Sequence, residues 1–163
     1  MVATTISREQ ILDWLSDVAD PEIPVLSIMD LGIVRGVTIN DEVVVDVTPT
    51  YSGCPATEVI EKSVIEALHD HGIENARLNR VLSPPWTTDW ISAEGREKLR
   101  EYGIAPPAAG GTKRELLYAS RSIACPRCAS TETEVVSEFG STACKASYKC
   151  NDCLEPFEYF KCI

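Results

Sequence analysis

Val43-Val-Val-Asp-Val-Thr-Pro-Thr-Tyr-Ser-Gly-Cys-Pro-Ala-Thr57 sets the fold of the N-terminal part of this chain. It opens with β-branched residues typical of a strand and continues through a polar loop. A helix is expected to begin near Pro55, because proline is favoured at the first helical position. The stretch therefore predicts a strand, a loop and a helix in succession, with Cys54 at or beside the start of the helix.

The flanking sequence extends this pattern into an α+β domain. Ser7 and Gln10 have the spacing of a capping box, in which two residues satisfy each other's backbone N–H groups at a helix start. The other predicted elements are a helix up to about Asp17, strands over 33–39, 43–47 and 76–82, and a helix that ends near Tyr102. This order of elements predicts a small mixed sheet with helices on one face.

Two short cysteine pairs determine the C-terminal fold. Cys125-Pro-Arg-Cys128 and Cys150-Asn-Asp-Cys153 are separated by 21 residues. Two residues between a pair of thiolates allow one tight turn to present both sulfurs to a single ion, and two such turns supply a tetrahedral shell. We therefore expect Cys125, Cys128, Cys150 and Cys153 to bind one structural Zn2+. Iron or an iron–sulfur cluster also accepts four thiolates, so the ligands alone leave the metal open.

The segment around these cysteines predicts a small all-β zinc ribbon. Strand-like pieces lie at 133–139, 146–149 and 156–161. The 41 residues at 123–163 bury too little apolar surface to fold alone, so the metal would hold the segment together. The predicted domains are therefore an α+β domain at 1–104, a Pro-, Ala- and Gly-rich linker at 105–122 and the four-cysteine ribbon at 123–163.

The overall composition limits the function classes. The chain has 163 residues, a net charge of −10 and 7 cysteines, six of which lie after residue 124. The acidic balance argues against a general nucleic-acid or anionic-membrane binder, because either needs a basic surface. An odd, clustered set of cysteines is unlike a secreted disulfide framework, and neither a secretory signal nor an apolar span is visible. We therefore expect a cytoplasmic protein with no nucleic acid and no membrane among its partners.

Cys54 is the candidate functional thiol. A helix N-terminus carries unpaired N–H groups and the positive end of the helix dipole, which favour the ionised thiol that acts as a nucleophile or a soft metal ligand. The alternative is that Cys54 is only a buried residue at the helix cap. The polar residues expected to support the thiol are Asp20, Glu22, Asp30, Ser52 and Thr57. For the three acidic residues the alternative is that they are solvated turn formers.

Cys144 and Cys162 are possible additional thiols near the ribbon. A cysteine outside a site is usually a small buried hydrophobic residue. The alternative is that the two thiols belong to a larger cluster site or to a redox pair. Their spacing does not decide between these interpretations.

Three N-terminal motifs resemble a known family. Asp20-Pro-Glu-Ile-Pro-Val25, Asp30-Leu-Gly-Ile-Val34 and Thr50-Tyr-Ser-Gly-Cys-Pro-Ala-Thr57 are similar to the MIP-type, or SufT-like, domain of cytosolic iron–sulfur cluster assembly factors. Further motifs resemble the D subunit family of phenylacetyl-CoA epoxidase (ring 1,2-epoxidase) systems, which serve phenylacetate catabolism and aromatic degradation. These motifs are Pro85-Trp-Thr-Thr-Asp-Trp90, Tyr102-Gly-Ile-Ala-Pro-Pro107, Phe139-Gly-Ser-Thr-Ala-Cys-Lys-Ala146 and Glu155-Pro-Phe-Glu-Tyr-Phe-Lys-Cys162.

The resemblance implies an accessory role. The epoxidase of such systems has a di-iron oxygenase subunit and a reductase with flavin and an iron–sulfur cluster, and the D subunit resembles a maturation factor that serves iron or cluster delivery to these client proteins. By this resemblance Cys54 corresponds to the reactive cysteine of the assembly domain, which would hold iron or a cluster transiently or contact the client. Cys144 and Cys162 fall inside motifs of the D subunit family, which favours a role for them.

Other functions stay open. The chain can be a structural or docking subunit of the oxygenase complex that uses the ribbon for protein interaction, or a thiol-dependent enzyme with Cys54 as nucleophile. The enzyme is the weaker alternative, because no histidine is placed to act as the base. A di-iron oxygenase is not expected, because Glu66-Ala-Leu-His69 is the only Glu-x-x-His pair and such a site needs two. A homodimer through an edge of the N-terminal sheet is a further expectation.

Overall fold

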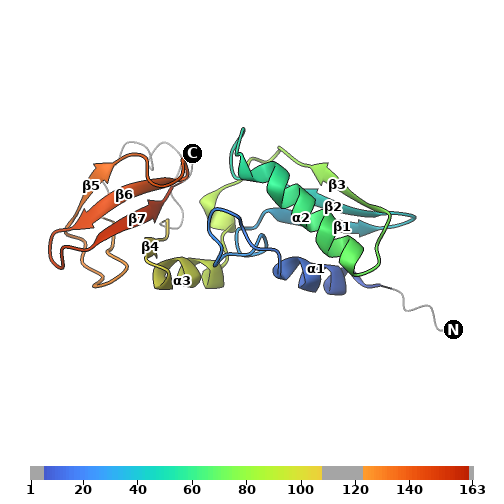
Figure 1. Cartoon of the computed structure of the whole chain (residues 1–163), viewed down its shortest axis with the longest axis horizontal. Helices are drawn as coiled ribbons and strands as arrows, with labels where there is room; N and C mark the ends of the chain where they lie inside the picture. The colour runs from blue at the N-terminus through green and yellow to red at the C-terminus, as the bar shows by residue number, and fades with distance from the viewer. Residues whose placement is uncertain (1–5, 108–122, 162–163) are drawn as a thin grey trace. The chain divides into compact units, whose positions relative to one another are not determined.

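The strands form two separate sheets, which belong to two units of the chain, Met1–Trp86 and Thr87–Ile163 (Figure 1). The structure is a computed structural model that describes residues 6–107 and 123–161. Within these residues, no helix combines the length and the apolar character that a bilayer span requires. Each unit is described below by itself.

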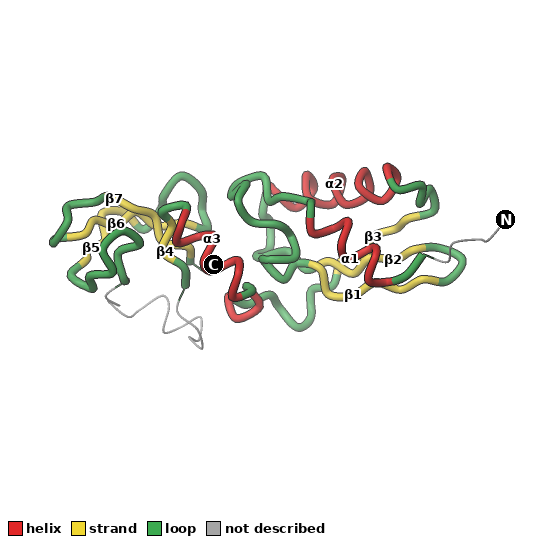
Figure 2. Tube along the Cα trace, turned by 90° about the horizontal axis from the view of Figure 1, so that it is seen from below, coloured by secondary structure: helices red, strands yellow, loops and turns green. Residues whose placement is uncertain are grey.

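The first unit, Met1–Trp86, is built on a mixed sheet with the strand order β1-β2-β3. β1 (Val34–Ile39) pairs antiparallel with β2 (Val43–Val47), and β2 pairs parallel with β3 (Ala76–Arg80). The parallel strands are connected by α2 (Ala56–Asp70), which packs on β3, while α1 (Arg8–Ser16) packs on α2 and β1 (Figure 2). The predicted mixed sheet is confirmed.

Burial along β2 alternates, which indicates that the helices cover one face of the sheet. Val43, Val45 and Val47 are buried, whereas Val44 and Asp46 are half-buried. Successive side chains of a strand point to opposite faces, so the three buried valines share the face that α1 and α2 cover. The opposite face is the more accessible one, as the prediction of helices on one face requires.

The core of the first unit is aliphatic. Leu15, Val64 and Leu68 have no exposed surface. Full burial of one such side chain contributes about 1.5–3 kcal/mol to folding. At the start of α1, Ser7 and Gln10 form the predicted capping box. Helix caps and aliphatic packing thus stabilise this unit without a metal.

The second unit, Thr87–Ile163, contains the other sheet, with the strand order β4-β7-β6-β5. Its elements are the 3-10 helix η1 (Thr88–Trp90), α3 (Ala93–Glu101), β4 (Ile104–Ala105), β5 (Thr133–Ser137), β6 (Lys145–Cys150) and β7 (Pro156–Phe160). β5 pairs antiparallel with β6, and β6 pairs antiparallel with β7. These three strands form the predicted all-β ribbon.

The sequence does not predict β4, because two residues are too few to show a strand pattern. β4 pairs in parallel with β7, and Ala105 is buried in the small core of the second unit. Ala105 is also the first residue of the predicted linker 105–122, and the predicted domain boundaries stay a prediction beside the two contact-based units. Residues 108–122 of that linker lie outside the described residues.

Candidate functional site

Four cysteine thiols meet in the second unit. Cys125 and Cys128 lie in the turn before β5, whereas Cys150 is the last residue of β6 and Cys153 lies in the turn between β6 and β7. The Sγ atoms are 3.7 Å apart in the pair Cys125 and Cys153, and 3.6 Å apart in the pair Cys128 and Cys150. All four sulfurs lie within 4.8 Å of one another. The fold therefore brings together the four residues that the spacing singles out.

The sulfur separations fit a tetrahedral zinc ion. A Zn–S bond is about 2.3 Å long, so two ligands of a regular tetrahedron lie about 3.8 Å apart. A disulfide would instead need sulfurs about 2.05 Å apart. Four thiolates are also the typical donor set of a structural zinc site. Cys125, Cys128, Cys150 and Cys153 would hold the ion, which would cross-link the two turns.

A residue with a positive φ closes each cysteine turn. Ala129 follows the first cysteine pair with a φ of 60°, and Leu154 follows the second with a φ of 62°. In the first turn, the N–H of Ala129 donates to the carbonyl of Cys125 at 2.9 Å. The left-handed conformation costs an L residue about 1–2 kcal/mol. Both turns therefore contain backbone strain, which the cross-link must offset.

Side-chain hydrogen bonds also join the two turns. Nη1 of Arg127 donates to Oε2 of Glu155 at 2.5 Å. Oγ of Ser130 donates to Oδ2 of Asp152 at 2.5 Å. In each bond one partner belongs to the first turn and the other to the second. These contacts keep the two cysteine pairs in register beside the metal site.

The thiols of the cluster have different pKa values. The backbone N–H of Cys153 donates toward the sulfur of Cys150 and lowers the pKa of that thiol to about 7. At Cys153 the N–H of Glu155 favours the thiolate, but burial and the neighbouring thiols raise the pKa to about 12. A metal ion that binds at neutral pH must therefore displace protons from this cluster.

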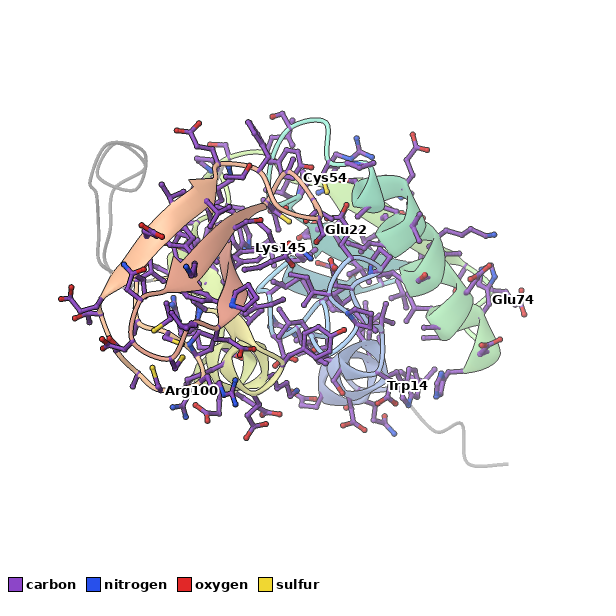
Figure 3. The ribbon with its side chains drawn as sticks, turned by 60° about the vertical axis from the view of Figure 1, so that its left-hand side comes forward. Trp14, Glu22, Cys54, Glu74, Arg100 and Lys145 are labelled. Atoms are coloured by element: carbon purple, nitrogen blue, oxygen red, sulfur yellow. The ribbon has the colours of Figure 1, made fainter. Side chains whose placement is uncertain are left out.

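Cys54 lies in the wall of a cavity of about 490 Å³ in the first unit. Pro55 is the N-cap of α2 and the helix begins at Ala56, so the thiol directly precedes the cap (Figure 3). The residues that line this cavity are Pro49, Tyr51, Ser52, Gly53, Cys54, Pro55, Thr57, Glu58, Arg80 and Leu82. The structure thus places the candidate thiol beside a hollow of the size of small-ligand sites, about 300–1,000 Å³.

The loop around Cys54 is a tight turn that leads into the helix. The N–H of Cys54 donates to the carbonyl of Tyr51 at 3.4 Å, and the N–H of Thr57 donates to the carbonyl of Cys54 at 3.1 Å. Gly53 has a φ of 83°, which glycine adopts without steric cost. Ser52 and Thr57 line the same cavity as the thiol, where their hydroxyl groups can donate hydrogen bonds.

Arg80 is the residue of this site that sequence reasoning missed. It pairs with Val47 at the ends of the parallel strands β3 and β2. Since parallel strands end at the same edge of a sheet, the loop after β2 and the residues after β3 meet there. The guanidinium group of Arg80 forms two hydrogen bonds of 2.8 Å with Glu61 on α2. The predicted strand–helix–strand order could have indicated that Arg80, near the end of the third strand, lies at the same edge of the sheet as the thiol.

The acidic residues predicted to support the thiol shape a neighbouring loop. Oδ1 of Asp20 accepts hydrogen bonds of 2.8 Å from the N–H groups of Glu22 and Ile23. Oδ2 of Asp30 accepts bonds of 3.0 and 3.1 Å from the N–H and hydroxyl of Ser27. Both aspartates are buried, and neither they nor Glu22 are among the cavity-lining residues. Their part in supporting the thiol stays a prediction.

The two histidines of the chain lie at the opposite end of α2 from Cys54. His69 is in the last turn of the helix and His71 is its C-cap. The 15 residues of α2 span about 22 Å, which excludes a hydrogen bond to the thiol. The ring of His71 stacks on Trp14 with centroids 4.2 Å apart, and its Nδ1 lies 2.8 Å from the carbonyl of Ala67. Neither histidine can act as a base for Cys54.

Cys144 is separate from the four-thiol cluster. Its side chain is buried, and its Sγ lies 3.0 Å from Oγ1 of Thr142. The metal-binding group found in the described residues contains only the four cysteines of the two turns. Cys162 lies outside the described residues. A larger cluster or a redox pair that includes these two thiols stays a prediction.

Two family models match the chain. The model described as "PaaD zinc beta ribbon domain" matches residues 109–161. The model described as "Iron-sulfur cluster assembly protein" matches residues 8–75. The first match includes the four-thiol cluster, and the second includes Cys54 and the cavity loop. The two candidate sites thus lie in regions of the chain that match two different family models.

Two relatives carry names that bear on function. A protein of Escherichia coli (strain K12), named "Putative 1,2-phenylacetyl-CoA epoxidase" and designated its D subunit, is 53% identical over 163 residues, which are 98% of this chain and 97% of that relative. A protein of Staphylococcus aureus (strain USA300), named "Fe-S protein maturation auxiliary factor SufT", is 40% identical over 80 residues. That match covers 46% of this chain and 88% of the relative.

Two solved structures share the fold of part of the chain. The crystal structure of a domain of unknown function, DUF59, from Bacillus anthracis matches with a TM-score of 0.53 and 28% identity, over 56% of this chain and 90% of that one. A conserved hypothetical protein from Thermotoga maritima matches with a TM-score of 0.51 and 32% identity, over 60% of this chain and 98% of that one. Both matches agree with the predicted α+β fold.

Proposed function

The chain belongs to the family of the 1,2-phenylacetyl-CoA epoxidase D subunit, and on that premise we propose that it is a maturation factor for a multicomponent epoxidase. In this role it assists the loading of iron or an iron–sulfur cluster into the oxygenase and reductase subunits. The observation that carries the proposal is the position of Cys54 in the wall of a 490 Å³ cavity, within the region that matches an iron–sulfur cluster assembly family. The name of the S. aureus relative supports the same role.

The chemistry of the cavity suits a cargo that is held and then released. A thiolate is a soft ligand for iron, and one thiolate binds a cargo less firmly than a complete protein site does. The hydroxyl groups of Ser52 and Thr57 can donate hydrogen bonds to a bound sulfide or thiolate. The guanidinium of Arg80 adds a positive charge at the cavity wall, although Glu61 already pairs with it. We propose that iron or a cluster is the substrate of this site and reaches its final ligands in the client.

A thiol enzyme is the less favoured alternative. A nucleophilic cysteine is usually activated by an adjacent base, and histidine is the commonest one. None of the residues that line the Cys54 cavity is a histidine, and α2 separates both histidines from the thiol. The lining thus supports a ligand role for Cys54 over acyl-transfer chemistry.

The test is the metal content of the client subunits. The oxygenase and reductase subunits are produced in cells together with the wild-type chain, with Cys54→Ser, or without this chain. With Cys54→Ser, we expect iron and acid-labile sulfide per reductase to fall toward the level found without the chain. Cys144→Ser is the matched control, because it makes the same substitution at a buried thiol of the other unit. A loss of loading with Cys54→Ser alone would assign the effect to the cavity thiol. Full client loading with Cys54→Ser would refute the proposal.

A docking role for the ribbon is the second candidate. Among the described residues of the second unit, four apolar side chains of the ribbon are more than half exposed, and exposed apolar side chains mark an interaction site where they form one patch. They are Val135 (55%), Val136 (66%), Phe139 (65%) and Leu154 (64%). If docking is the function, Val136→Ser with Phe139→Ser abolishes co-purification with the oxygenase, whereas Cys54→Ser leaves it unchanged. If co-purification is lost with Cys54→Ser and is unchanged with the double substitution, the result favours the maturation role.

Homodimerisation is part of the same proposal. β1 and β3 are the edge strands of the first sheet, and an edge strand offers unpaired N–H and carbonyl groups to another chain. We propose that two chains associate through one of these edges. Sedimentation velocity of the purified protein tests this, because a monomer over the working concentration range contradicts it.

A further inference from the structure

The four thiols of the metal site differ sharply in their access to solvent. Cys150 is 0% exposed and Cys125 is 2% exposed. Cys153 is half-buried, whereas Cys128 is exposed. A solvent-borne reagent therefore reaches Cys128 more readily than the buried ligands Cys125 and Cys150. This asymmetry does not depend on the function of Cys54.

We propose that Cys128 is an oxidation site and that its oxidised form closes onto Cys150 in a disulfide, which opens the metal site. The ribbon is then a thiol switch in addition to a structural module. The oxidant is a small peroxide, for which hydrogen peroxide is the simplest probe. The inference depends on the four-cysteine site of the ribbon, and neither client loading nor Cys54 enters it.

The chemical balance needs one peroxide for each disulfide. The Cys128 thiolate attacks one oxygen of hydrogen peroxide, so that an S–O bond forms, the O–O bond breaks, and hydroxide leaves to become water. The Cys150 thiolate then attacks the Cys128 sulfur, so that the S–S bond forms, the S–O bond breaks and a second hydroxide leaves. Two electrons pass from the two thiolates to the peroxide. A bound metal ion would lose two of its four ligands in this step.

Geometry selects Cys150 as the partner. Its Sγ lies 3.6 Å from that of Cys128, and the side chain is fully buried, so a solvent thiol does not compete for this position. A disulfide needs the sulfurs about 2.05 Å apart, which requires a movement of about 1.5 Å. A Cys128–Cys150 disulfide would join the two turns, as a bound metal ion would. A second peroxide would oxidise Cys125 and Cys153, whose sulfurs are 3.7 Å apart.

The contacts between the turns make this reaction reversible. Arg127 with Glu155 and Ser130 with Asp152 join the turns through atoms other than sulfur. In the zinc-bound ribbon they hold the cysteine pairs opposite each other, so that a disulfide forms across the turns, in place of random pairs, before the metal leaves. Reduction by a dithiol restores the four thiolates, and added zinc restores the site.

The experiment uses the full chain with zinc bound. The background variant is Cys54→Ser with Cys144→Ser and Cys162→Ser, which removes the three thiols outside the site. A stoichiometric amount of hydrogen peroxide is added, and released zinc is followed with a chromophoric chelator. We expect release on oxidation, and full zinc binding again after reduction and addition of zinc. Zinc retention during complete thiol oxidation overturns the proposal.

Peptide mapping identifies the first disulfide. Trypsin separates the cysteines onto peptides 122–127, 128–145 and 150–161. A Cys128–Cys150 disulfide joins 128–145 to 150–161, and fragmentation between Cys150 and Cys153 locates the linked sulfur. A first product that joins 122–127 to 128–145, which is a disulfide within the first turn, overturns the proposal.

Alkylation order tests the exposure argument independently. With a limiting amount of N-ethylmaleimide, we expect Cys128 to be modified about tenfold faster than Cys125 or Cys150, because reaction needs access as well as a thiolate. Quantitative mass spectrometry of the same three peptides measures the order. Equal labelling of the four ligands would mean that the site opens as a whole, and the proposal would fail.

Discussion

The two units of this chain obtain their stability from different sources. In the first, aliphatic side chains such as Leu15, Val64 and Leu68 are fully buried between two helices and a sheet. In the second, the core cluster has six buried residues, and two of them are the metal ligands Cys125 and Cys150. The metal site of the second unit is thus part of its hydrophobic core. We therefore expect a metal-independent fold and a metal-dependent fold in the same chain.

Metal removal should have the strongest effect and should separate the two units. Binding free energies of structural zinc are about 10–16 kcal/mol at neutral pH, which exceeds the stability that a small ribbon core can supply. After treatment with a strong chelator, we expect amide protection to disappear over β5, β6 and β7 and to persist over α1, α2 and the first sheet. Hydrogen exchange with mass spectrometry measures both regions in one sample. Loss of protection in both units would contradict the contrast between them.

A cavity in the aliphatic core should affect the other unit. Leu68→Ala removes a fully buried side chain from α2. Substitutions of this kind cost about 2–5 kcal/mol, from lost burial and from the cavity that remains. We expect the free energy of unfolding of the first unit to fall by that amount, while zinc content stays at one ion per chain. The exposed Leu82→Ala is the matched control and should change little.

The pH should act on the metal-dependent unit through proton competition. Cys153, with a pKa of about 12, keeps its proton across the neutral range until a metal displaces it. Cys150, with a pKa of about 7, is a thiolate above that pH and adds one more proton to be displaced below it. Each displaced proton lowers zinc affinity about tenfold per pH unit. The fall in affinity should therefore steepen below pH 7.

A competition titration with a chelator of known affinity between pH 5.5 and 8.5 would measure this slope. Cys54→Ser is the control, since that thiol lies in the other unit and should leave the curve unchanged. A slope that is constant across pH 7 would contradict the assignment of the low pKa to Cys150. It would also show that the ligands do not titrate in the order that their hydrogen bonds indicate.

Local sequence patterns predict most of the helices, strands and metal ligands. Long-range strand pairing accounts for the features that these patterns miss. The capping box at Ser7 and Gln10 and the four metal cysteines are local patterns, and the fold has both. β4 is too short to carry a pattern and exists because β7 offers an edge to pair with. Arg80 reaches the Cys54 cavity only because β2 and β3 are parallel neighbours. Such pairings follow from topology, which no single segment encodes.

The weakest of the predicted effects concerns the strained turns of the ribbon. Leu154 has a φ of 62° and is 64% exposed, so its side chain contributes little burial to offset the strain. The left-handed conformation costs an L residue about 1–2 kcal/mol, whereas glycine adopts it freely but loses about 0.5–1 kcal/mol of chain entropy on folding. Leu154→Gly should therefore stabilise the zinc-bound ribbon by a few tenths to about 1 kcal/mol.

The control for this substitution is Val135→Gly, which removes a similarly exposed side chain (55%) from β5, where the residue pairs with Tyr148 and no positive φ needs relief. It should destabilise the ribbon by about 0.5–1 kcal/mol, because glycine weakens a strand. Thermal unfolding with excess zinc compares the two variants with the wild type. If Leu154→Gly lowers the midpoint as much as Val135→Gly does, turn strain does not limit the ribbon. Its stability would then depend on the metal and the core cluster alone.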